Sequence, residues 1–130
     1  MYDLEFIEFA EREGITFSIL ADDEIDGYTN MEKFPFVGSR IAWSQLSLHE
    51  RKNIAEVDEF YFMIQQLYPI NDTQQIILFG YDFEQGYLID FSALRLVLKF
   101  LTDYPGENYL LGKKETWCIC VYDELDFGVI

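Results

Sequence analysis

The segment WCICVYDELDFGVI, residues 117–130, decides the fold class. Successive side chains of a β-strand point to opposite faces, so Trp117 and Ile119 share one face and Cys118 and Cys120 share the other. Both faces are apolar, and this pattern predicts a strand in the middle of a sheet that is covered on both sides. The acidic residues that follow are expected to form a turn at the end of that sheet.

The sequence on either side of this segment predicts further strands and helices. Apolar and β-branched runs indicate strands at 15–20, 75–80, 87–89, 109–111 and 116–122, a returning strand at 127–130 and a short strand within 36–43. Apolar side chains at helical spacing indicate helices over 3–13, 55–68 and 93–103. Ser47 or Asn53 is expected to cap the second helical segment and Ser92 the third. The polar stretch 21–33 is expected to be an exposed loop.

The order of these elements indicates the architecture. Helices and strands are mixed without a regular βαβ alternation, which favours an α+β fold with a mainly antiparallel sheet of about four or five strands packed with about three helices. Residues 1–130, of which half are hydrophobic, are expected to form a single domain. A sheet edge at 127–130 leaves room for a homodimer, so monomer and homodimer both remain open.

Hydropathy and cysteine usage indicate the compartment. No apolar run approaches the roughly 20 residues of a membrane span, and residues 1–5 lack the basic start of a signal peptide. We therefore expect a cytoplasmic protein that has no membrane partner. Cys118 and Cys120 are poorly placed for a disulfide and lack the second Cys or His pair of a structural zinc site, so buried thiols are expected.

Charge is the most unusual property of the chain. The formal net charge is −15, and the balances over residues 1–32, 33–55, 56–90 and 91–130 are −9, +3, −7 and −2. A small domain typically carries a net charge of magnitude about 2–8. The excess indicates a basic protein partner or a role in solubility. It argues against nucleic acid as a direct ligand, because phosphate binding needs clustered Lys and Arg.

Enzyme chemistry finds little support in the sequence. His49 is the only histidine, it is expected to lie at the surface or at a helix start, and no nucleophile, P-loop or dinucleotide motif accompanies it. Residues 22–27 resemble the start of a calcium loop, but Lys33 stands where a bidentate Glu is required. Carboxylate pairs that act on sugars are possible, yet chance pairs are expected in so acidic a chain. We therefore expect neither catalysis nor a cofactor.

Three acidic clusters are the candidate binding residues, because each contains or adjoins aromatic side chains. Aromatic anchors ringed by carboxylates suit a basic protein surface, where opposite charge speeds encounter and rings supply contact area. The alternative is a solvated acidic face over an ordinary aromatic core. The candidate contacts are Asp22, Asp23, Glu24, Asp26 and Tyr28 in the first cluster, Asp82 and Glu84 in the second, and Asp123, Glu124 and Asp126 in the third.

The stretches YLIDFSALRLVLKFL (87–101) and ENYLLGKKETWCICVYDELDFGVI (107–130) show a family resemblance. A strand, a Trp-led apolar strand, an acidic turn and a short Phe-Gly strand follow one another. This pattern is similar to that of small acidic bacterial immunity proteins of polymorphic and contact-dependent toxin systems. The likeness covers the last third to half of the chain and rests on apolar patterning.

The resemblance implies a function that agrees with the charge. Immunity proteins have no catalytic activity and neutralise a cognate toxin by binding it. Many such toxins are nucleases with basic clefts, which an acidic partner covers or blocks from beside. The expected target is an RNA-cleaving toxin, of which an EndoU-type endonuclease is one candidate. Two alternatives remain open: an adaptor or regulatory module that binds another basic protein without inhibiting it, and an enzyme of unrecognised type.

Overall fold

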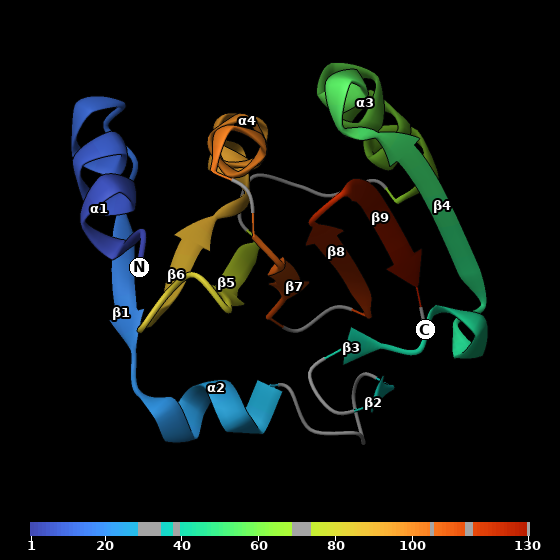
Figure 1. Ribbon diagram of the computed structural model, residues 1–130, viewed down its shortest axis with the longest axis horizontal. Coiled ribbons are helices and arrows are strands. Elements are labelled where there is room, and N and C mark those ends of the chain that lie inside the picture. The colour runs from blue at the N-terminus through green and yellow to red at the C-terminus, as the bar shows by residue number, and fades with distance from the viewer. Residues whose placement is uncertain (29–34, 38–39, 69–73, 105, 114–115, 130) are drawn as a thin grey trace.

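Seven strands form one antiparallel sheet in the order β1-β6-β5-β7-β8-β9-β4 (Figure 1). The computed structural model describes residues 1–28, 35–37, 40–68, 74–104, 106–113 and 116–129. The fold is α+β with an antiparallel sheet, as predicted, although the sheet has seven strands instead of four or five. The strands are β1 (Phe17–Leu20), β4 (Leu48–Asn53), β5 (Gln75–Gly80), β6 (Gly86–Asp90), β7 (Asn108–Gly112), β8 (Trp117–Val121) and β9 (Glu124–Val129).

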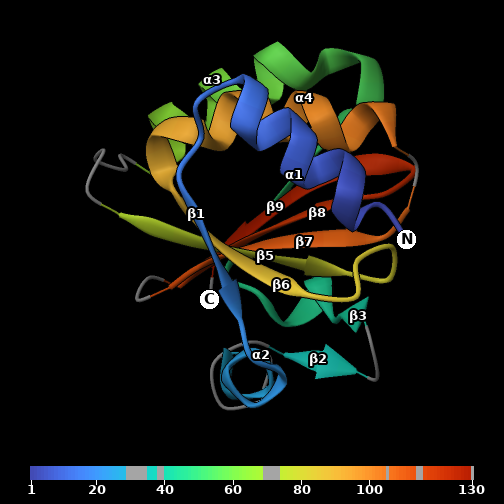
Figure 2. The same ribbon diagram turned by 90° about the vertical axis from the view of Figure 1, so that its left-hand side faces the viewer.

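Three helices cover one face of this sheet, and they are α1 (Asp3–Arg12), α3 (Val57–Leu67) and α4 (Leu94–Asp103) (Figure 1 and Figure 2). Phe6 of α1, Phe60 of α3 and Trp117 of β8 are fully buried between the helices and the sheet. Burial of an apolar side chain of this kind contributes about 1.5–3 kcal/mol. This layer forms the main core.

The helix α4 follows from its apolar spacing. The side chains that it buries recur every three or four residues, as an amphipathic helix requires, and they are Leu94, Val97, Leu98, Phe100 and Leu101. The expectation that Ser92 caps this helix is wrong. The 3-10 helix η3 (Phe91–Ala93) precedes α4, so Ala93 takes the cap position and no side chain caps the helix.

The opposite face of the sheet is covered by the segment that contains β2 (Phe36–Val37), β3 (Arg40–Ile41) and the 3-10 helix η1 (Trp43–Gln45). Phe36 and Ile41 belong to a second apolar cluster with residues of β7 and β8. Where the sequence predicted one short strand within 36–43, the structure has two short antiparallel strands, and residues 38–39 lie outside the described part.

The strand β8 confirms the interpretation of residues 117–121. It pairs with β7 on one side and β9 on the other, and all its residues are buried. Trp117 and Ile119 lie in the main core, whereas Cys118 and Cys120 lie in the second cluster. The two cysteines are free buried thiols.

The acidic stretch that was expected to be a loop contains a short helix, α2 (Asp22–Tyr28), so the loop assignment is wrong for these residues. Negative charge stabilises the first turn of a helix because the N-terminal N–H groups are unpaired. Three acidic residues occupy that turn, and the Glu24 carboxylate accepts a hydrogen bond from the Ala21 N–H at 3.2 Å. The Ile25 side chain lies against Gly86 of β6, which anchors the helix.

The strand β4 was not predicted, because its sequence LHERKN is polar after Leu48. It lies at the sheet edge and pairs with β9 alone, so a fully apolar face is not required. Asn53 caps the following 3-10 helix η2 (Ile54–Glu56), and its side-chain oxygen Oδ1 accepts a hydrogen bond from the Ala55 N–H at 2.9 Å. Of the two proposed caps, Asn53 is therefore correct, since the Ser47 hydroxyl donates to the Val129 carbonyl instead.

The position of β9 corrects the expected dimer edge. β9 lies between β8 and β4, so residues 127–129 are paired on both sides and offer no free sheet edge. Residue 130 lies outside the described residues. The two edges of the main sheet are β1 and β4.

Candidate functional site

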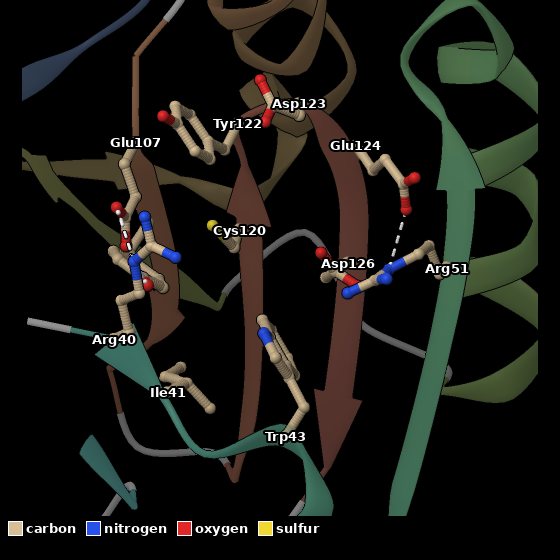
Figure 3. A pocket seen from close by; sticks show the side chains of 11 residues that line it. Arg40, Ile41, Trp43, Arg51, Glu107, Cys120, Tyr122, Asp123, Glu124 and Asp126 are labelled. Atoms are coloured by element: carbon tan, nitrogen blue, oxygen red, sulfur yellow. Dashed lines mark hydrogen bonds and ion pairs between the residues drawn. The ribbon is translucent and has the colours of Figure 1, made fainter. Parts of the chain in front are cut away.

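A groove of about 420 Å³ lies on the sheet face opposite α1, α3 and α4, and we call it the sheet groove. Figure 3 shows Cys120 of β8 at its centre, with Arg40 and Glu107 on one side and Arg51 and Asp126 on the other. The aromatic rings of Trp43 and Tyr122 lie at its two ends. The lining consists of four carboxylates, Glu107, Asp123, Glu124 and Asp126, together with Arg40, Arg51, Ile41, Trp43, Tyr109, Cys120 and Tyr122.

Two of these carboxylates are buried although they are charged. Glu107 is 8% exposed and Asp126 is 7% exposed. A buried carboxylate is costly unless hydrogen bonds or cations satisfy it. One Glu107 oxygen accepts from the Tyr109 hydroxyl at 2.7 Å, and Asp126 Oδ1 lies 2.7 Å from both Arg51 Nε and His49 Nε2. The groove therefore holds two carboxylates that the fold has already positioned.

The two arginines are held with different strength. Arg51 Nε lies 2.7 Å from Asp126 and 2.9 Å from Glu124, and these contacts raise the pKa of its guanidinium. Arg40 Nε lies 3.4 Å from Glu107 Oε2, and its side chain is 67% exposed. Charge-assisted hydrogen bonds are usually about 2.7–2.9 Å long. Arg51 is thus part of the wall, whereas Arg40 is loosely attached to it.

The centre of the groove is uncharged. Burial above all, together with the nearby Glu107 and Asp126 carboxylates, raises the pKa of the Cys120 thiol to about 12, although the hydrogen bond with Tyr109 acts in the opposite direction. Burial and the contacts with Cys120 and Glu107 also raise the pKa of the Tyr109 hydroxyl. Both groups are therefore neutral near pH 7, and Cys120 is no nucleophile there.

A second cavity of about 370 Å³ lies between α2 and the turn that joins β5 to β6, and we call it the α2 hollow. Its carboxylates come from two acidic clusters that are about sixty residues apart in the sequence, Asp22 and Asp26 on α2 and Glu84 in the turn. The rest of its lining consists of Ile25, Phe79, Gly80, Phe83 and Gln85. The fold therefore gathers negative charge around apolar walls.

The other candidates of the first two clusters lie outside this hollow. Asp23 and Glu24 are exposed on α2, and Glu24 is used to cap that helix. Tyr28 ends α2, but its side chain lies outside the described part. Asp82 packs against Gly106, and its Oδ2 is buried with no hydrogen-bond partner in the described structure.

The third cluster divides at the end of β8. Asp123 is exposed in the turn, as expected, whereas Glu124 and Asp126 belong to strand β9. The expectation that all three lie in a turn is therefore wrong. Asp126 pairs with Cys120 of β8, so β9 begins within the acidic cluster. Arg51 of the neighbouring strand β4 neutralises Glu124 and Asp126. All three line the sheet groove.

Several groove residues were not singled out from the sequence. His49 adjoins the groove and is exposed, as one of the two expectations for it had it, and it lies on β4 and not at a helix start. It contacts Asp126 and stacks on Trp43 with ring centroids 4.7 Å apart. Glu107 directly precedes β7, and alternation from residue 107 to residue 109 places its side chain on the same face as that of Tyr109, a signal that could have paired them. No local pattern indicates that Arg40 lies beside Glu107, because the contact spans 67 positions.

In the ranges that the structure describes, no three His, Cys, Asp or Glu side chains are placed to hold a metal ion. No helix in those ranges is both long and apolar enough to span a membrane.

No family model matches the chain, and neither does any curated protein. Geometry and charge alone define the candidate site. It consists of the sheet groove and the α2 hollow.

Proposed function

We propose that this chain is an immunity protein that binds and neutralises a cognate bacterial toxin in the cytoplasm. The favoured toxin is a basic nuclease, and within that class an RNase. The observation that carries the proposal is the α2 hollow, where Asp22, Asp26 and Glu84 surround apolar walls in a chain of net charge −15. The resemblance of residues 87–130 to small acidic immunity proteins supports the same function.

The proposed mechanism is occlusion without chemistry. A nuclease cleft is basic because it holds phosphates, so a surface that gathers carboxylates is attracted to it. The α2 hollow and the sheet groove together offer seven carboxylates, with Phe79, Trp43 and Tyr122 as aromatic contact area. Opposite charge speeds association, and packed aromatic side chains slow dissociation. The bound protein would cover the toxin's catalytic groups or block the approach of RNA.

The adaptor or regulatory module remains the second candidate. The same charge and the same hollows suit any basic protein, whether or not binding inhibits it. The neutral Cys120 and Tyr109 in the groove argue against nucleophilic catalysis at that place.

Co-expression tests the proposal directly. A toxin domain from a neighbouring reading frame, the proposed cognate toxin, is induced in a susceptible bacterium, with this chain or with an empty vector, and growth and total RNA integrity are followed. Immunity predicts growth and intact RNA only when this chain is present. Stable binding of the two purified proteins without rescue of growth would favour the adaptor. If the chain neither binds that toxin nor protects the cells, the proposed function is wrong.

A further inference from the structure

We propose that the sheet groove binds an arginine side chain of the basic partner, whose guanidinium displaces Arg40 from Glu107. The inference rests on the proposed function, because the partner is the toxin. It adds the residue type that enters the groove and the group that this residue replaces.

Glu107 is the receiving carboxylate. It is 8% exposed, lines the groove, and has one oxygen fixed by the Tyr109 hydroxyl at 2.7 Å. The other oxygen faces Arg40. A buried carboxylate in this position needs a cation, and its orientation is set before any partner arrives. The site is therefore built for a guanidinium.

Arg40 already shows where that guanidinium would sit. Its Nε lies 3.4 Å from Glu107, and its Cζ lies 5.8 Å from the centre of the Tyr122 ring. The side chain is 67% exposed, and exposed ion pairs contribute little. A partner arginine can therefore replace Arg40 at low cost, and the displaced side chain remains in water.

The lining favours arginine over other ligands. The carboxylates outnumber the arginines four to two, so the groove repels anions. Arg40 already lies over the Tyr122 ring, and a planar guanidinium stacks on such a ring better than an ammonium group does. Its volume of about 420 Å³ lies within the usual range of roughly 300–1,000 Å³ for small-ligand sites.

The test uses a small probe and does not require the toxin. N-acetyl-L-arginine methylamide is titrated into the ¹⁵N-labelled protein at low salt, and backbone amide shifts are followed by NMR. Shifts are expected at Ile41, Cys120 and Tyr122 of the groove and not on α1. N-acetyl-L-citrulline methylamide has the same shape without the charge, so it is expected to cause no such shifts.

Two substitutions have opposite expected effects. Arg40→Gln removes the competing guanidinium and is expected to strengthen probe binding about two- to fivefold. The matched control is Arg12→Gln on α1, which removes the same charge from a 70% exposed side chain outside the groove. Glu107→Gln keeps an acceptor for Tyr109 but loses the charge, so binding is expected to weaken about tenfold. Glu8→Gln on α1 is its matched control.

Three results would each overturn the inference: shifts confined to the α2 hollow, equal binding of the citrulline probe, or equal effects of Arg40→Gln and Arg12→Gln. Arg40 is exposed, so its variant should fold even where Glu107→Gln does not. The proposed function is tested separately by growth. Rescue without arginine binding rejects the groove alone, whereas arginine binding without rescue rejects the immunity function.

Discussion

Asp123 and Asp126 belong to one acidic cluster in the sequence, yet they have different physical environments. Asp123 is exposed, whereas Asp126 is 93% buried and contacts both Arg51 and His49. An exposed acid such as Asp123 adds to the long-range electrostatic field, whereas a buried and paired acid such as Asp126 holds strands together. Asp126 thus links β9 to the edge strand β4.

Replacing Asp126 by Asn should therefore destabilise the fold, and replacing Asp123 by Asn should not. Removal of one partner from a buried pair leaves the other unsatisfied. Because Arg51 is half exposed, we expect a loss of about 1–3 kcal/mol for Asp126→Asn and less than about 0.5 kcal/mol for Asp123→Asn. Urea unfolding at pH 7 measures both. Equal stabilities would mean that Asp126 contributes charge alone.

The buried thiols give a second prediction at the residue scale. Because burial raises the pKa of Cys120 to about 12, its thiolate fraction at pH 8 is small, and the burial of Cys118 raises its pKa as well. Iodoacetamide should alkylate the folded protein about 10²–10³-fold more slowly than the urea-unfolded chain. Ser92→Cys places a thiol at an exposed site and should react rapidly in the folded protein. Rapid labelling of wild type would contradict this burial.

The raised pKa of Cys120 also contributes to the dependence of stability on alkaline pH. The folded-state pKa of Cys120 lies above the ordinary value of 9.0, so the unfolded chain releases this proton first. The contribution of the neutral thiol is therefore complete below pH 9 and is lost as pH rises toward about 12. Cys120→Ser should reduce the loss of stability between pH 9 and pH 11, as measured by urea unfolding.

Close contact between β5 and β7 is a constraint at the scale of the elements. A Cβ added to Gly80 would lie 2.6 Å from the Glu107 carbonyl oxygen and 2.7 Å from the Asn108 Cα, and backbone cannot move aside as a side chain can. Gly80→Ala should therefore destabilise the protein by about 2–3 kcal/mol. The matched substitution Gly27→Ala meets open space within α2 and should stabilise it by about 0.5–1 kcal/mol. Thermal unfolding measures both variants, and we expect a lower Tm for Gly80→Ala and a higher Tm for Gly27→Ala.

Elements with a strong apolar pattern could be predicted from the sequence. The two-sided apolar β8 and the amphipathic α4 lie close to where their periodicity placed them. β4 and α2 were missed for physical reasons that lie outside their own sequences. β4 needs only one partner strand, and α2 gains its stability from helix-end charge and from the contact of Ile25 with Gly86.

The candidate site was predictable only in part. Acidic side chains are visible in any sequence, and the structure brings Asp22, Asp26 and Glu84 around one hollow. The groove carboxylate Glu107 could not be chosen in the same way, because its partner Arg40 comes from a distant segment. Contacts between distant segments depend on strand order, which local patterns do not determine.

At the scale of the whole molecule, the excess of acidic residues destabilises the folded state in two ways and creates a negative field in solvent. Like charges repel in the compact state, and buried carboxylates require partners. In the sheet groove the buried carboxylates have such partners, because Arg40 contacts Glu107 and Arg51 contacts Asp126. Asp22 and Asp23 on α2 are exposed, and their field extends into solvent. Long-range attraction should therefore arise mainly around α2.

Charge reversal tests this division through association kinetics with the partner that we propose, a basic toxin domain. Asp22 and Asp23 are changed together to Lys, and Glu8 and Glu11 on α1 are changed together to Lys as a control that is matched in net charge. If α2 steers encounter, the first variant should associate about tenfold more slowly at low salt and respond less to added salt. The control should lose much less. Equal losses would mean that net charge acts without regard to position, and unchanged rates in both would place the steering surface elsewhere on the molecule.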